Sequence, residues 1–222
     1  MKFRYLLQRL IMILTGFLFA VYAAYNVFVI VRDSRRGLSN EGKLISGAVA
    51  LMFALLAVFV WTGNTKTKNI RWLKVRRVSL IIALGVIILL KLRMVVKVID
   101  YLDFSQAYTI LYGAAYLMTV AALLLLFIYF VFILKKLPFH PRAAVALPTV
   151  AMILFLLSLA IETILFFVYG IGMEANVIRT IVIRPVFYLG FVGLCVYFLM
   201  PSVPVQTKSE KAVQTESEKE GQ

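Results

Sequence analysis

The sequence predicts an all-α fold, a polytopic bundle of transmembrane helices followed by a disordered C-terminal tail. Apolar residues make up 63% of the 222 residues, well above the roughly 45–50% of soluble domains. They gather in runs that can cross a bilayer core of about 30 Å, which takes about 20 helical residues. The 24 Lys and Arg residues, against 10 Asp and Glu, form short clusters between these runs. The excess positive charge therefore indicates loops beside anionic lipid headgroups rather than a nucleic-acid-binding face.

Five spans follow from long runs without charge. The first two runs, after Arg9 and after Lys43, each contain 22 uncharged residues. The first is longer than the roughly 7–15 residues of a signal-peptide core, so we expect a retained anchor rather than a cleaved leader. Later runs contain 31, 19 and 23 residues, and the last begins at Pro185, which suits a first helical turn.

The third predicted span has a short uncharged run, because only 13 residues, Val78–Leu90, precede Lys91. A run of that length alone is typical of a re-entrant or buried segment. Continued to Val98 it reaches 21 residues and can span if its charged half faces protein or water. We expect Lys91 to point away from the other charges and to extend toward an interface. The expected spans are about 10–31, 44–64, 78–98, 107–134, 144–170 and 183–200.

The distribution of Lys and Arg residues among the loops bears on whether the chain has six spans or five. With the N-terminus inside, six spans place 12 of these residues in the cytoplasm and nine outside, before the tail is counted. Five spans place 14 inside and seven outside, so charge alone slightly favours five. We prefer six because the third helix is then amphipathic and the polar groups converge. The chain is thus expected to be multi-pass in the cell membrane, with both termini cytoplasmic.

The last segment, 203–222, differs from the rest of the chain. It is rich in Glu, Lys, Ser, Thr and Gln, contains no aromatic residue, and repeats VQTKSEK as VQTESEK. Such a composition cannot bury enough apolar area to fold. We expect a disordered cytoplasmic tail, either a docking segment or simply a solubilising end.

Small residues recur at helical spacing on the first two spans, where they would let helices approach closely. The predicted helix-packing residues are Gly16, Ala20, Ala24, Gly47, Ala50 and Ala54. With six spans, both termini inside and an A-x-x-x-A at Ala20, the chain loosely resembles the substrate-binding subunits of energy-coupling-factor transporters. That resemblance implies that these faces dock a partner transmembrane subunit. A homo-oligomer is the alternative use.

Polar groups from several spans are predicted to meet in the outer half of the bundle. Arg93, Lys97 and Asp100 form one stripe, at i, i+4 and i+7. Counted at 1.5 Å per residue, Asn26, Arg93 and Glu162 lie ~22–26 Å from the inner boundary. A carboxylate within a span needs a partner and by default marks a functional site, so we expect Arg93 or Lys97 to pair with Glu162. The predicted ligand-binding residues are Asn26, Arg93, Lys97, Asp100, Tyr112, Tyr116, Glu162 and Arg184.

The sequence offers little support for catalysis. It contains one Cys and one His, too few for a thiolate or imidazole metal cage, and we expect neither a metal nor a cofactor. No G-x-S-x-G, H-E-x-x-H or P-loop pattern is present, and the D-x-x-D of Asp100 and Asp103 lacks acidic neighbours. The residues indicate a non-enzymatic membrane protein, and the alternative is a membrane-embedded enzyme that uses Glu162 or Asp100 and Asp103.

Two functions remain open. The first is a binding or transport module in which an outward-facing polar pocket takes up a small polar or anionic solute. The second is a membrane scaffold or sensory module whose intramembrane charges hold the helices together, because buried charges in membranes require mutual pairing whether or not they bind a ligand.

Overall fold

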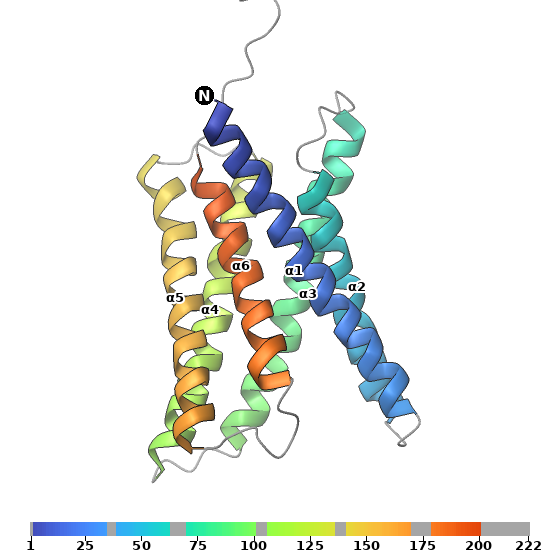
Figure 1. The fold of residues 1–222 in the computed structure, drawn as a ribbon, viewed down its shortest axis with the longest axis vertical. Coiled ribbons are helices and arrows are strands. Elements are labelled where there is room, and N and C mark those ends of the chain that lie inside the picture. The colour runs from blue at the N-terminus through green and yellow to red at the C-terminus, as the bar shows by residue number, and fades with distance from the viewer. Residues whose placement is uncertain are drawn as a thin grey trace, which may run out of the picture.

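The computed structural model describes residues 2–34, 39–62, 70–100, 106–135, 141–169 and 179–200, and these are helical almost throughout. Successive helices alternate in direction, so the start of α1 and the end of α6 lie at the same end of the bundle (Figure 1). The helices are α1 (Lys2–Ser34), α2 (Asn40–Trp61), α3 (Ile70–Asp100), α4 (Ala107–Lys135), α5 (Pro141–Tyr169) and α6 (Arg184–Leu199), with a π-helical turn, η2 (Arg179–Ile183), leading into α6.

The six-span prediction is confirmed. Six of the helices in the described ranges are long and apolar enough to cross a bilayer. The third segment does not stop at Leu90, because α3 continues as one helix to Asp100 and has an apolar window, Val78–Val96, of 19 residues. The predicted tail, 203–222, lies outside the described residues.

An aromatic cluster forms the centre of the bundle. Phe19 of α1 is fully buried, and its ring centroid lies 5.8 Å from that of Phe53 on α2 and 5.2 Å from that of Phe191 on α6. In lipid there is no hydrophobic force to bring helices together, so close packing of this kind supplies much of their association. At the end away from the N-terminus, α1 and α2 lean away from α4, α5 and α6 (Figure 1).

The predicted small-residue faces occupy varied environments. Ala50 is buried, Gly47 and Ala20 are partly buried, and Ala24 and Ala54 are exposed. Gly16 packs directly beneath the indole of Trp61, whose Nε1 donates to the backbone oxygen of Ile13 at 3.3 Å. Close approaches also occur at two glycines of α6 that the sequence did not single out. Gly190 faces the ring of Phe19, and Gly193 faces Thr15.

Candidate functional site

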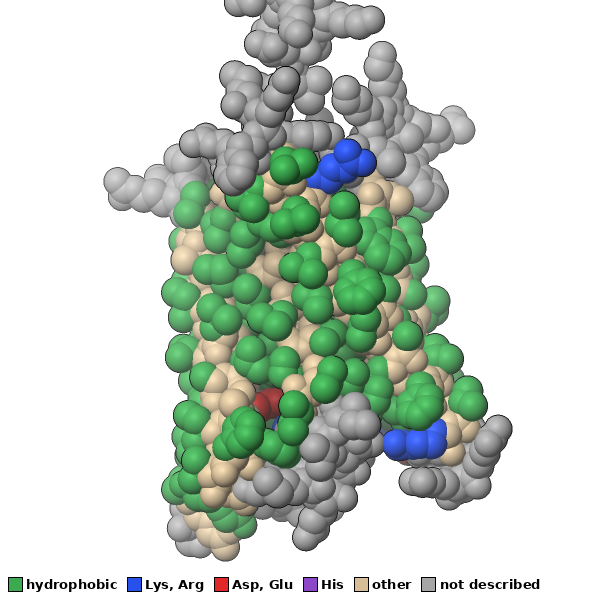
Figure 2. Space-filling view, in the orientation of Figure 1, with side chains coloured by type: hydrophobic (Ala, Val, Ile, Leu, Met, Phe, Trp, Pro, Cys, Tyr) green, Lys and Arg blue, Asp and Glu red, His purple; other side chains and the backbone are tan. Residues whose placement is uncertain are grey.

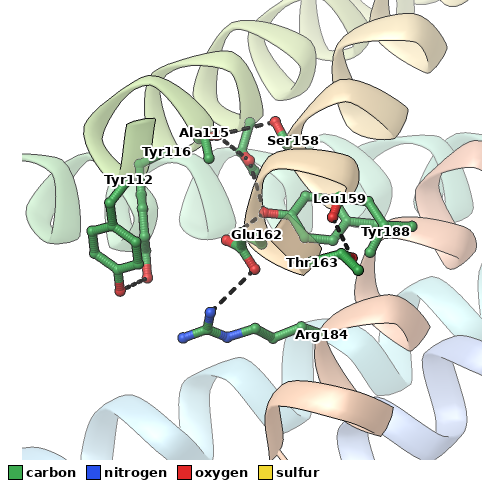
Figure 3. Close-up of polar contacts among 10 residues, drawn as sticks. Tyr112, Ala115, Tyr116, Ser158, Leu159, Glu162, Thr163, Arg184 and Tyr188 are labelled. Atoms are coloured by element: carbon green, nitrogen blue, oxygen red, sulfur yellow. Dashed lines mark hydrogen bonds and ion pairs between the residues drawn. The ribbon is translucent and has the colours of Figure 1, made fainter. Parts of the chain in front are cut away.

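Glu162 of α5 is the centre of a polar cluster within the bundle. Its residue surface is 6% exposed. Oε1 accepts a hydrogen bond of 2.8 Å from the hydroxyl of Tyr188, and Oε2 lies 3.4 Å from Nη1 of Arg184 (Figure 3). Oε2 accepts no hydrogen bond in the described part of the chain. A buried carboxylate within a span is costly unless paired, and here α6 supplies both of its partners.

Hydroxyl groups extend this cluster from α5 and α6 to α4. The Tyr188 hydroxyl lies 3.1 Å from Oγ1 of Thr119. Thr119 also donates to the backbone oxygen of Ala115 at 2.8 Å, and Ser158 of α5 donates to the same oxygen at 3.0 Å (Figure 3). The network therefore links three helices by side chains that are all buried.

The counter-ion of Glu162 is Arg184 and not Arg93. The prediction that Arg93 or Lys97 pairs with Glu162 was therefore wrong for Arg93. The Arg184 guanidinium carries five N–H donors. Within the described residues it forms the ion pair with Glu162 but no hydrogen bond. Its side chain is 24% exposed. The side chain of Lys97 lies outside the described residues, as does that of Asp100.

Arg93 of α3 pairs instead with Glu41, in the first turn of α2. Both side chains are substantially exposed, at 40% and 64%. An exposed ion pair contributes at most about 1 kcal/mol, because water and salt screen it.

We therefore predict that Arg93→Gln lowers the free energy of unfolding by less than about 1 kcal/mol. Denaturant unfolding of the purified protein in micelles measures this difference. A loss of several kcal/mol would show that Arg93 has a buried partner after all.

Lys91 lies inside the bundle, and the prediction that it extends away to an interface was wrong. Its Nζ lies 4.4 Å from the ring centroid of Phe187 and 5.4 Å from that of Tyr116. Lys91 and Arg93 are two residues apart, about 200° around a helix. Because Arg93 faces the start of α2, Lys91 is turned toward α4 and α6, where aromatic faces can stabilise its ammonium.

A polar cavity of about 150 Å³ is lined by residues of all six helices, α1 to α6. It continues into an adjoining hollow of about 210 Å³ beside α2 and α3. Tyr112, with its hydroxyl 3.2 Å from that of Tyr116, lies beside the cavity wall rather than in it. The lining residues of the polar cavity are Tyr22, Tyr25, Asn26, Val29, Ser46, Lys91, Tyr116, Glu162, Ile183, Arg184, Phe187 and Tyr188.

The structure thus brings together four of the predicted ligand-binding residues at one cavity, and these are Asn26, Tyr116, Glu162 and Arg184. Arg93 lines only the adjoining hollow. Sequence reasoning missed Lys91 and Tyr188. A signal for Tyr188 was available, because it follows Arg184 by four residues and therefore shares its helix face.

The described residues contain no group of three His, Cys, Asp or Glu side chains placed to hold a metal ion. The polar groups that line the cavity are ammonium, guanidinium, carboxylate, phenol, amide and hydroxyl groups. Comparison with known proteins found no family model, curated protein or solved structure that matches the chain.

Proposed function

We propose that the protein binds a small anionic solute in the polar cavity, as a binding or transport module of the membrane. The observation that carries this proposal is the environment of Arg184. Its guanidinium lines the cavity and makes an ion pair but no hydrogen bond within the described residues. Largely buried N–H donors are costly when they lack acceptors, and a bound carboxylate or phosphate would supply them in the bidentate geometry that guanidinium favours.

The charges lining the cavity support an anion. Lys91 and Arg184 are cationic, and Glu162 is the one acidic side chain among the lining residues. The oxygens of Glu162 already interact with Tyr188 and Arg184, and the formal charges of the lining residues sum to +1. Hydroxyl and amide groups of Tyr25, Asn26 and Ser46 can add hydrogen bonds that orient the solute.

The location of the cavity favours entry from outside the cell. Glu162 lies seven residues before the end of α5, the end away from the N-terminus of the chain, about 10 Å along the helix. Segments 1–9, 66–77 and 135–142 together contain 12 Lys and Arg residues and no acidic residue. The positive-inside rule assigns such segments to the cytoplasm, so the cavity belongs to the outer half of the bundle.

Thermal unfolding of the full chain in lipid nanodiscs tests the proposal. Acetate, butyrate and inorganic phosphate are titrated separately as probes. At least one is expected to raise the unfolding temperature of the wild type. Lys91→Met is expected to abolish the shift. Arg184→Lys keeps the partner of Glu162 but loses the planar donor fork, so it should weaken binding at least tenfold.

Lys43→Gln is the matched control, because Lys43 is in the first turn of α2 near the same end and is not among the cavity-lining residues. It should respond as the wild type does. The absence of a shift with every probe, or equal loss in Lys91→Met and Lys43→Gln, would contradict anion binding.

A scaffold or sensory module is the second candidate, and the buried network from Ala115 to Glu162 favours it. This network joins α4, α5 and α6 through side chains of the protein itself, which is what a purely structural role requires. For a scaffold, Tyr188→Phe would lower stability while no anion shifts the unfolding temperature, and deletion of 203–222 would release a bound protein in a pull-down.

A further inference from the structure

An apolar crevice lies on the other side of the Glu162–Arg184 pair, between α5 and the η2–α6 segment. Its volume is about 90 Å³, room for several methylene groups. Apart from the ion pair, its lining residues are Leu159, Thr163, Phe166, Phe167, Ile181 and Pro185. Figure 2 shows a mostly apolar face of the bundle with one acidic side chain in a hollow. Glu162 is among the residues that line the crevice.

The crevice opens where lipid chains would contact the protein. Phe167 is 70% exposed and Ile181 is 48% exposed, and both belong to helices that can span a bilayer. Thr163 donates its hydroxyl hydrogen to the backbone oxygen of Leu159 at 2.7 Å, so it offers no donor to the crevice. The walls therefore suit hydrocarbon, and polar groups lie at the inner end.

We infer that the solute is an amphiphilic monoanion, with its anionic group at Arg184 and a hydrocarbon tail in this crevice. The inference rests on the proposed function, since it names the class of solute for the same site. Glu162 and Arg184 line both the polar cavity and the crevice, so a head group at Arg184 lies where the two spaces meet. A tail in the polar cavity would displace groups that need hydrogen bonds, whereas the crevice offers it apolar contacts.

Glu162 does not prevent this arrangement. Its Oε1 accepts from Tyr188 and its Oε2 faces Nη1 of Arg184, so its charge is balanced within the protein. The Arg184 ion pair uses no hydrogen bond in the described residues, which leaves the guanidinium donors available to the head group. A lipid acyl chain of the surrounding bilayer is the competing occupant of the crevice.

The test is a series of straight-chain carboxylates from acetate to octanoate, titrated against the full chain in nanodiscs and referred to the free aqueous concentration. Each methylene that enters the crevice should tighten binding about fourfold. The gain should end when the crevice is full. If butyrate and octanoate bind no tighter than acetate, the inference fails while the proposed function stands. If no carboxylate binds and phosphate also has no effect, the proposed function itself fails.

A matched pair of variants separates the crevice from ordinary partitioning into lipid. Thr163→Phe fills the crevice from its exposed wall, and Ile164→Phe adds the same ring one residue away, at a site that is 50% exposed and is not among the lining residues. Thr163→Phe should keep the affinity for acetate and lose the gain with chain length, whereas Ile164→Phe should keep both. If affinity increases equally with carboxylate chain length in both variants, the increase comes from the bilayer and the inference is overturned.

Discussion

Arg184→Met is expected to lower the free energy of unfolding by about 3–5 kcal/mol, the usual loss when one partner of a buried ion pair is removed. The substitution leaves Glu162 without its cation, and the side chain of Glu162 is only 7% exposed. Tyr188 still donates to Oε1, but one hydroxyl does not balance a full charge in a medium of low dielectric constant.

Glu162→Gln is expected to lower the free energy of unfolding by less than Arg184→Met does, near the lower end of that range. The amide oxygen of Gln can still accept from Tyr188, so the link between α5 and α6 survives. Arg184 is at the first residue of α6 and its side chain is 24% exposed. A long cationic side chain near a helix end can extend to the interface and recover part of its hydration. The two single variants should therefore differ although they break the same pair.

The double variant Glu162→Gln/Arg184→Met completes the cycle. Neither buried charge remains unpaired in it, so it should be more stable than Arg184→Met alone. Denaturant unfolding in micelles measures all four proteins, with Arg93→Gln as a control that removes a cation from an exposed pair. Losses that simply add would show that Glu162 and Arg184 are not energetically coupled.

The helices could be predicted from the sequence because the cost of charges in lipid determines where spans begin and end. The same reasoning identified Glu162, because a carboxylate within an apolar span is costly whether the chain has five spans or six. The third helix was harder to assign because its charges start after 13 uncharged residues. The structure accommodates them on two different faces, with Arg93 toward Glu41 and Lys91 over Phe187.

The pairing of charges could not be predicted, because it depends on how each helix is rotated and which helices are neighbours. Depth along the helices placed Arg93 and Glu162 at the same level, and depth carries no information on which helices are neighbours. Packing decides between Arg93 and Arg184: α5 lies against α6, while α3 lies against α2 and α4. Glu162 therefore meets a residue of α6.

The small-residue pattern has the same limitation. Small residues at i, i+4 and i+8 on α1 and at i, i+3 and i+7 on α2 predicted packing faces, but the spacing does not show which glycine touches a neighbouring helix. Gly190 and Gly193 form an equally simple i, i+3 pair on α6, and these two meet α1 at close range. Spacing alone gave no reason to prefer them.

Gly190→Ala is accordingly expected to destabilise the protein by about 1–3 kcal/mol through overpacking. A Cβ at Gly190 would lie 2.7 Å from Cε1 of Phe19, a ring that is fully buried among Phe53 and Phe191 and cannot move aside without disturbing both. Because packing rather than hydrophobic transfer holds helices together in lipid, a gap opened between α1 and α6 is not compensated elsewhere.

Gly47→Ala is the matched control for the same substitution. A Cβ there would lie 3.9 Å from Cδ1 of Ile30, an ordinary contact, and Ala has the higher helix propensity by up to about 1 kcal/mol. Gly47→Ala should therefore be neutral or slightly stabilising in the same unfolding assay. If both variants lose equal stability, the cost arises from the helix backbone and not from the contact between Gly190 and Phe19. If Gly190→Ala is neutral, α1 and α6 do not pack as closely as the structure shows.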